Sequence, residues 1–245
     1  MRPSRTARAA LAGLLALAAA GAALYGLAHA LPLPQRLGEA HSVLVEYRDG
    51  SPAHVALAPD GRWRVATQLA ALDPSYVPAL LALEDARFRL HPGVDPLAVL
   101  RALWLNTTRG RRVSGASTLT LQLVRMLEPR PRTLRSKALE ALRALQLELR
   151  LSKEELLAAY LQFVPYGRNV EGVEAASLAY FGHTARHLSP AEVATLLAVP
   201  QAPARRFPTE ANARRLRAAR DEVARRLLAA GRLPLGPEGA RATPE

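Results

Sequence analysis

A long uncharged segment near the N-terminus is the feature that most constrains this chain. Residues 9–35 contain no Asp, Glu, Lys or Arg and are rich in Ala and Leu, and three arginines precede them. A helix crosses a bilayer with about 20 apolar residues, so this segment is long enough to span a membrane. Because positive flanks stay in the cytoplasm, we expect residues 1–8 to form a cytoplasmic basic tail and the rest of the chain to be exported.

The same segment also has the features of a secretory signal peptide, with Ala28-His29-Ala30 as a small-residue cleavage site. A cleaved signal usually has an apolar core of about 7–15 residues, which Ala9–Leu27 exceeds. We therefore favour an uncleaved transmembrane anchor over residues 9–31 and leave cleavage as the alternative. The chain has no cysteine, which is compatible with an oxidising compartment and excludes thiol nucleophiles and zinc-thiolate sites.

The formal charge is +12, and Lys137 and Lys153 are the only lysines among the cations. Such a charge favours anionic partners: nucleic acid, anionic lipid headgroups or phosphorylated substrates. An exported domain meets the last two more often, and no nucleic-acid-reading motif occurs, so we expect no nucleic-acid partner. The bias toward arginine itself is equally well explained by genome composition.

After the apolar segment, a short β-like region precedes a long helical one. Asp-Gly turn signals at 49–50 and 60–61 separate short apolar runs, which predicts a β-hairpin in a juxtamembrane segment, residues 32–68. From Asp73 to Gly231 the periodicity predicts about seven helices, so the fold class is mainly α. We expect an amphipathic helix at 209–233 that packs on the domain, and a flexible tail at 234–245. The expected helix N-caps are Asp73, Asp95, Ser117, Thr133, Ser152 and Ser189.

Glu84 is the first candidate for chemistry. If residues 78–90 form one helix, Glu84 lies one turn from both Leu80 and Phe88, on a face with apolar neighbours. A partly desolvated carboxylate there suits proton transfer. The competing interpretation is a solvated face on which Glu84 and Asp85 pair with nearby arginines.

Two further stretches carry groups suited to an anionic substrate. The small-residue sequence VSGAS leads into an expected helix at Ser117, and helix N-termini attract anions. Lys137, Glu140 and Arg143 are spaced three apart, which places them on one helical face. A capped helix explains the first pattern equally well, and a salt-bridged surface explains the second.

Five segments together resemble a known family in their order and spacing. The segments are EDARFRLHPGVD, SGASTLTLQLVR, the SKALE helix, KEELLAAYLQFVPYG, and EGVEAASLAYFG with LSPAEVATLLAVPQAP. They are similar to the five motifs of family 51 peptidoglycan glycosyltransferases, the glycan-polymerising domains of class A penicillin-binding proteins. Neighbouring LAPDGRWRV and PRPRTL resemble the 1C branch of that family. Five ordered motifs are far more specific than any single one.

The resemblance implies a bilobed, lysozyme-like, mainly α domain over residues 69–208 that lies on the membrane and polymerises lipid II. By motif position, Glu84 would take the proton from the 4-hydroxyl of the acceptor GlcNAc. That oxygen would attack the anomeric carbon of the donor MurNAc with inversion and expel undecaprenyl pyrophosphate. Glu140 would be a second catalytic residue, near the pyrophosphate. The implied substrate-binding residues are Asp85, Phe88, His91, Ser117, Thr118, Gln122, Arg125, Arg132 and Lys137.

A departing diphosphate needs fixed cations, and arginine supplies bidentate contacts. The sequence requires no cofactor; a divalent cation, Mg²⁺ or Mn²⁺, would assist the pyrophosphate, although no metal-ligand spacing occurs. The implied partners are lipid II, the growing glycan strand, the membrane and other cell-wall synthesis proteins. The implied location is the inner membrane, crossed once, with the catalytic domain on the periplasmic side.

Five positions depart from the motifs of the family. Ala116 stands in place of glycine, Leu121 of glutamine, Ser136 of arginine, Gln162 of asparagine and His183 of lysine. Most lie outside the proton-transfer step, so they bear on the rate more than on the type of reaction. The loss of two cations weakens the expected binding of the donor.

Two other classes of function stay open. A lytic transglycosylase or lysozyme-like hydrolase shares the fold and a single catalytic Glu, but it has little use for the basic residues of the motifs. A catalytically weakened scaffold for cell-wall synthesis is the second, and the retained motif carboxylates argue against it. No Ser-x-x-Lys nucleophile of a transpeptidase occurs, so we expect a monofunctional enzyme, with a truncated 1C-type protein as the alternative.

Overall fold

The computed structural model describes residues 5–108 and 117–233. The described part is mostly helical with two small two-stranded sheets, which confirms the mainly α prediction. Its principal elements are α1 (Arg5–Ala30), β1 (Val43–Glu46), β2 (Pro52–Ala56), α2 (Tyr76–Glu84), α3 (Pro96–Thr108), α4 (Leu119–Leu127), α5 (Leu134–Arg150), α6 (Lys153–Phe163), β3 (Pro165–Gly167), β4 (Val170–Glu171), α7 (Val173–Phe181), α8 (Pro190–Ala198), α9 (Pro203–Arg206) and α10 (Ala213–Ala229). The helical region thus contains nine described α-helices rather than about seven, the shortest being the single turn α9.

Some of the predictions fall on residues outside the described ranges. These are Ala116 with the start of its loop, the first half of the basic tail and the tail at 234–245.

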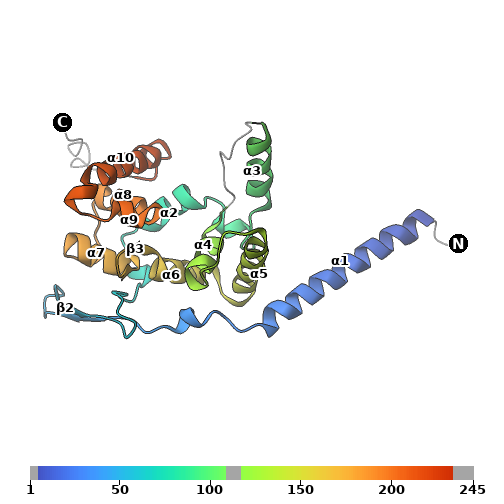
Figure 1. Ribbon diagram of the computed structural model, residues 1–245, viewed down its shortest axis with the longest axis horizontal. Helices are drawn as coiled ribbons and strands as arrows, with labels where there is room; N and C mark the ends of the chain where they lie inside the picture. The colour runs from blue at the N-terminus through green and yellow to red at the C-terminus, as the bar shows by residue number, and fades with distance from the viewer. Residues whose placement is uncertain (1–4, 109–116, 234–245) are drawn as a thin grey trace.

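α1 projects from the other helices as a single arm (Figure 1). Its segment Leu11–Ala30 is long and apolar enough to cross a membrane, and almost none of it is buried against the rest of the chain. One apolar N-terminal helix was expected, and it is present. Its length and composition fit both the anchor and the signal-peptide interpretation.

Polar side chains of α5 hold the C-terminal end of α1. Arg143, Gln146 and Arg150 donate hydrogen bonds to main-chain carbonyls within residues 29–32, at 3.0, 2.6 and 3.3 Å. The three donors share one face of α5. The last carbonyls of a helix have no partner within the helix, and cations nearby interact favourably with its dipole. These bonds fix the arm to the domain.

The predicted hairpin is present as the antiparallel pair β1–β2. Its turn contains Asp49 and Gly50, and Gly50 has φ +81°, a conformation that side-chain-bearing residues rarely adopt. The Asp49 carboxylate accepts the N–H of Ser51 at 2.9 Å, as is common in such turns. The Asp-Gly signal therefore identified the turn correctly.

The core lies where α4 packs between α5 and α6, and where α10 packs on α8. α3 and α5 stand at one end of the folded part and α7 to α10 at the other, with α4 and α6 between them (Figure 1). On α10, Val223 and Leu227 are buried while Leu228 is 38% exposed. The C-terminal helix therefore packs on the domain, and its buried apolar face includes Val223 and Leu227 but not Leu228.

Helix caps agree with the sequence at four of six positions. Asp95, Thr133, Ser152 and Ser189 each accept a main-chain N–H of the helix that follows, and the last two form capping boxes. Two predictions were wrong. α4 is capped by Thr118 rather than Ser117, because the Thr118 hydroxyl accepts the N–H of Leu121. α2 begins after Ser75, since the Asp73 carboxylate forms a tight turn with the Ser75 N–H instead of capping the helix.

A buried ionic network ties the segment before the helices to the domain. Arg64 is fully buried, and its guanidinium donates to Glu171 at 2.7 and 2.9 Å. Arg36 donates to the same carboxylate at 3.0 Å and to the carbonyl of Met126 at 2.6 Å. Both guanidinium groups lie 5.3 Å from the ring centroid of Phe163. Charges buried in this way are tolerated only when they are paired.

We expect Arg64→Ala to lower the free energy of unfolding by about 3 kcal/mol, because the truncation leaves Glu171 buried with fewer partners. Urea unfolding of the detergent-solubilised chain, followed by circular dichroism, measures the loss. Arg48→Ala, at the exposed hairpin turn, is the matched control and should change the same free energy by less than about 0.5 kcal/mol. Equal effects of the two substitutions would contradict a central role for the network.

Candidate functional site

Glu84 is the last residue of α2, so the helix predicted over residues 78–90 ends at Glu84. Asp85 leaves the helical conformation, with φ −159° and ψ 74°, and a 3-10 turn at Phe88–Leu90 follows. The Glu84 side chain, at this end of the helix, lines a cleft of about 480 Å³. The walls of this cleft come from α2, α4, α6, β3, α8, the turn after α8 and the segments on either side of α4.

Both oxygens of the Glu84 carboxylate accept hydrogen bonds from amide side chains. Gln122 Nε2 donates to Oε2 at 3.1 Å, and Gln201 Nε2 donates to Oε1 at 3.2 Å. The Tyr160 hydroxyl donates to Gln122 Oε1 at 3.2 Å, which turns the NH₂ of Gln122 toward Glu84. Burial, with the nearby Glu84 charge, raises the pKa of Tyr160 well above its ordinary value, so this hydroxyl keeps the proton that it donates.

Asp85, His91 and Thr118 are buried and lie beneath the cleft rather than in its walls. The Asp85 carboxylate accepts the first N–H of α4, from Leu119, at 3.0 Å and lies 3.0 Å from His91 Nε2. The Thr118 hydroxyl donates to the carbonyl of Gly93. A protein carboxylate therefore occupies the N-terminus of α4, where the sequence suggested a bound anion.

Phe88 is likewise buried, 2% exposed, and packs under the same turn. The Lys153 ammonium lies 4.5 Å from its ring centroid and donates to the carbonyl of His91 at 2.7 Å. Phe88 therefore supports the loop that follows Glu84, and it does not line the cleft.

Arg125, on α4, lines the same cleft as Glu84 and carries a positive charge. Its Nε donates to Glu140 Oε2 at 2.8 Å and its Nη1 to Ser117 Oγ at 3.0 Å. The Glu140 side chain is 9% exposed and the Arg125 side chain 45% exposed. Glu140 thus holds the guanidinium from beneath, and the rest of Arg125 faces the cleft.

The other predicted cations are placed differently. Arg132 lines the cleft, whereas Lys137 is exposed on α5 outside its walls. Arg143, expected on the same face as Lys137 and Glu140, pairs with Glu128 at 3.1 Å. The structure therefore brings Glu84, Ser117, Gln122, Arg125 and Arg132 together around the cleft, with Glu140 directly behind Arg125.

Three of the departures from the family motifs have local structural roles. Leu121 is buried in the core. The Ser136 hydroxyl lies 3.0 Å from that of Thr133, the cap of α5. Gln162 accepts the N–H of Thr67 at 2.8 Å and donates to the carbonyl of Val65 at 2.9 Å, which holds that strand-like segment against α6.

Sequence reasoning missed Gln201 and Tyr160 as members of the site. Gln201 lies in the quoted LAVPQAP segment, and no spacing rule links it to Glu84, 117 residues away. Tyr160 lies on α6, where an aromatic residue at helical spacing is most simply explained as part of the core.

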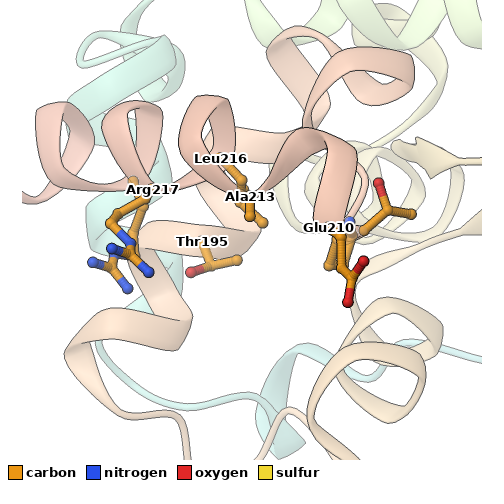
Figure 2. A pocket seen from close by; sticks show the side chains of 8 residues that line it. Thr195, Glu210, Ala213, Leu216 and Arg217 are labelled. Carbon is orange, nitrogen blue, oxygen red and sulfur yellow. The ribbon is translucent and has the colours of Figure 1, made fainter.

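A second hollow, of about 460 Å³, lies between α8 and the start of α10, away from these residues. Figure 2 shows Ala213 and Leu216 on α10 pointing toward Thr195 on α8. Its lining includes Glu210, Arg217 and Arg220, and none of the candidate catalytic or substrate-binding residues. We assign the chemistry to the cleft at Glu84.

Within residues 5–108 and 117–233, no group of three or more His, Asp or Glu side chains is arranged to hold a metal ion.

Comparison with known proteins gives one family for the chain. The transglycosylase family matches residues 51–228. Penicillin-binding protein 1C of Escherichia coli is 42% identical over 209 residues, which is 85% of this chain and 27% of that protein. Penicillin-binding protein 1A of Aquifex aeolicus is 43% identical over 131 residues, 53% of this chain and 18% of that protein. The chain thus spans about a quarter or less of the length of these relatives.

A solved structure, penicillin-binding protein 1A from Haemophilus influenzae, aligns with 88% of this chain and 21% of its own. The TM-score is 0.44 and the sequence identity 18%, values that do not by themselves establish a common fold.

His183, which stands where the family has lysine, gives a prediction about pH. Its Nδ1 lies 2.9 Å from the Thr184 carbonyl and its Nε2 lies 3.0 Å from Glu192 Oε1. Both neighbours are acceptors, so the ring can donate to both of them only as an imidazolium. The Thr184 carbonyl, with the Glu192 carboxylate, raises the pKa of His183 despite partial burial.

Since the pKa is raised in the folded state, this stabilisation is fully present below pH about 6.5 and is lost as the pH rises through the folded value. We expect His183→Gln to lower the free energy of unfolding by about 0.5 kcal/mol at pH 5.5, because the pair is partly exposed, and to have almost no effect at pH 9. Urea unfolding at the two pH values measures this, with exposed His54→Gln as the control. The same loss at both pH values would contradict the assignment.

Proposed function

The chain belongs to the transglycosylase family, and on this premise we propose that it is a peptidoglycan glycosyltransferase. It polymerises lipid II into β-1,4-linked glycan strands and releases undecaprenyl pyrophosphate. The observation that carries the proposal is the Glu84 carboxylate, held by two amide donors at a cleft that Arg125 and Arg132 also line. The bilobed, lysozyme-like form and the single transmembrane anchor belong to the same proposal.

Glu84 is the general base of the proposed reaction. Its carboxylate accepts the proton of the 4-hydroxyl of the acceptor GlcNAc as that oxygen attacks the anomeric carbon of the donor MurNAc. The new glycosidic bond forms as the bond from that carbon to the pyrophosphate oxygen breaks, with inversion. Because Gln122 and Gln201 hold both oxygens, the carboxylate cannot rotate freely, which favours one geometry of proton transfer.

Arg125 and Arg132 act on the leaving group. Negative charge grows on the pyrophosphate as its bond to the sugar breaks, and fixed cations stabilise that charge. A guanidinium has five N–H groups, and the bonds from Arg125 to Glu140 and Ser117 use two of them. The other N–H groups can contact the pyrophosphate. Glu140 thereby acts through Arg125, which supports a positioning role for this carboxylate.

We propose no resident metal for this step. Mg²⁺ is usually held by one or two carboxylates together with substrate phosphates. The carboxylates on this side of the cleft, Glu128 and Glu140, are already paired with arginines. The proposed reaction therefore uses the arginines, and no divalent cation, to stabilise the leaving pyrophosphate.

The basic lining of the cleft favours the polymerase over a glycan-cleaving enzyme. A hydrolase acting on neutral glycosidic bonds expels no diphosphate and gains little from Arg125 and Arg132. The intact hydrogen bonds from Tyr160 through Gln122 to Glu84 disfavour the scaffold, since a decayed site has no need of them. Membrane placement with the cleft on the periplasmic side, and contacts with other cell-wall synthesis proteins, are further parts of the proposal.

We expect Glu84→Gln to reduce polymerisation of fluorescent lipid II by about 10²–10⁴-fold, because the amide cannot accept the hydroxyl proton. Gel separation of the products and a thermal unfolding scan of the same sample measure activity and folding together. Glu154→Gln, an exposed acid outside the cleft, is the control and should polymerise normally.

Two outcomes would refute the proposal. Shortening of added glycan strands would assign the chain to the lytic class. A folded wild type that makes no strands would assign it to the scaffold class.

A further inference from the structure

We propose that Gln201 is a positioning residue for Glu84 and that Arg206 locks it in that role through the turn between α8 and α9. The inference rests on the proposed function, because it concerns the base of that reaction. It adds to the site a second hydrogen-bond donor for Glu84, from a segment outside the motif that contains Glu84.

Two amide side chains bind the Glu84 carboxylate. Gln122 on α4 holds Oε2 and Gln201, after α8, holds Oε1. The two donors come from separate segments and grip opposite oxygens, so together they fix the plane of the carboxylate. Either donor alone leaves the group free to turn about its last side-chain bond.

Arg206 fixes the orientation of the Gln201 amide. Arg206 Nη1 donates to Gln201 Oε1 at 3.0 Å and to the carbonyl of Ala198 at 2.7 Å. An amide has one oxygen and one NH₂ group. Because the guanidinium occupies the oxygen, the NH₂ of Gln201 must face Glu84; the flipped amide would set donors against donors.

Aromatic contacts anchor the turn that carries Gln201 and Arg206. Phe207 follows Arg206, and the Arg168 guanidinium lies 4.5 Å from the centroid of the Phe207 ring. The Phe207 and Tyr180 rings pack edge-on, with their centroids 5.7 Å apart. Gly167 passes so close that a Cβ there would lie 2.9 Å from the Phe207 ring. These contacts of Phe207 hold the end of the turn that lies opposite Gln201.

The bond from Gln201 affects the proton-transfer step. Gln201 is exposed in the open cleft, so sugar that fills the cleft removes competing water from its bond to Glu84. Gln201 thus keeps the Glu84 carboxylate in one orientation while the acceptor hydroxyl approaches.

The test compares kcat and KM for lipid II in the full-length chain. Gln201→Ala should lower kcat about tenfold, the effect of one hydrogen bond to a charged group, with KM unchanged. Gln201→Glu should lower kcat at least as much, because a carboxylate has no N–H to donate to Glu84. Arg206→Met should lower kcat by less than Gln201→Ala, with KM unchanged, because Gln201 keeps its amide but loses the bond that orients it.

Arg205→Met, an exposed neighbour on α9, is the matched control and should behave as the wild type. A raised KM with an unchanged kcat would make Gln201 a substrate contact and overturn the inference. So would wild-type kinetics in both Gln201 variants. Absence of strands from the wild type removes the proposed function and this inference with it, whereas an active wild type with unaffected variants removes the inference alone. Thermal unfolding of each variant identifies any loss of folding, and in that case Arg206→Met carries the test.

Discussion

The buried contact between Arg64 and Glu171 is the interaction on which the arrangement of the domain depends. It joins the chain before the helices to β4, which lies between α6 and α7 in the sequence. Main-chain bonds reinforce the same join, because the N–H of Trp63 donates to Asn169 and the N–H of Glu171 donates to Trp63. Buried charges are stable only when they are paired. The contact between Arg64 and Glu171 therefore fixes one position on the domain for the segment that follows α1.

A second constraint lies at Asp85, where one residue ends α2 and supports the start of α4. Its N–H bonds back to Leu81 in α2, and its carboxylate accepts the first N–H of α4. The distance between Glu84 and Gln122 follows from this, because the two residues occupy fixed positions on the two helices that Asp85 connects. Burial of Asp85 thus fixes the geometry of its half-buried neighbour, Glu84. The same division of labour holds for Glu140 and Arg125.

Local signals in the sequence predicted local structure well. Asp-Gly located the hairpin turn, and Ser152 and Ser189 located helix starts, because each depends on contacts within a few residues. The family motifs placed Glu84, Gln122 and Arg125 in one site. Sequence failed where a distant group decided the outcome: the helix at Glu84 ends early because Asp85 bonds to α4, and Gln201 reaches Glu84 only through tertiary packing. Charge pattern alone also could not separate Arg64, which is buried, from the many arginines in water.

α5 connects two parts of the molecule that are otherwise far apart. At its C-terminal end Arg143, Gln146 and Arg150 grip the arm, and toward its other end Glu140 holds Arg125. From Arg150 to Glu140, which holds Arg125, the helix rises about 15 Å at 1.5 Å per residue. In the proposed membrane-bound form, in which α1 crosses the bilayer, this length of α5 sets the distance between the bonded end of α1 and Arg125. The distance of the cleft from the end of α1 therefore depends on the length of α5.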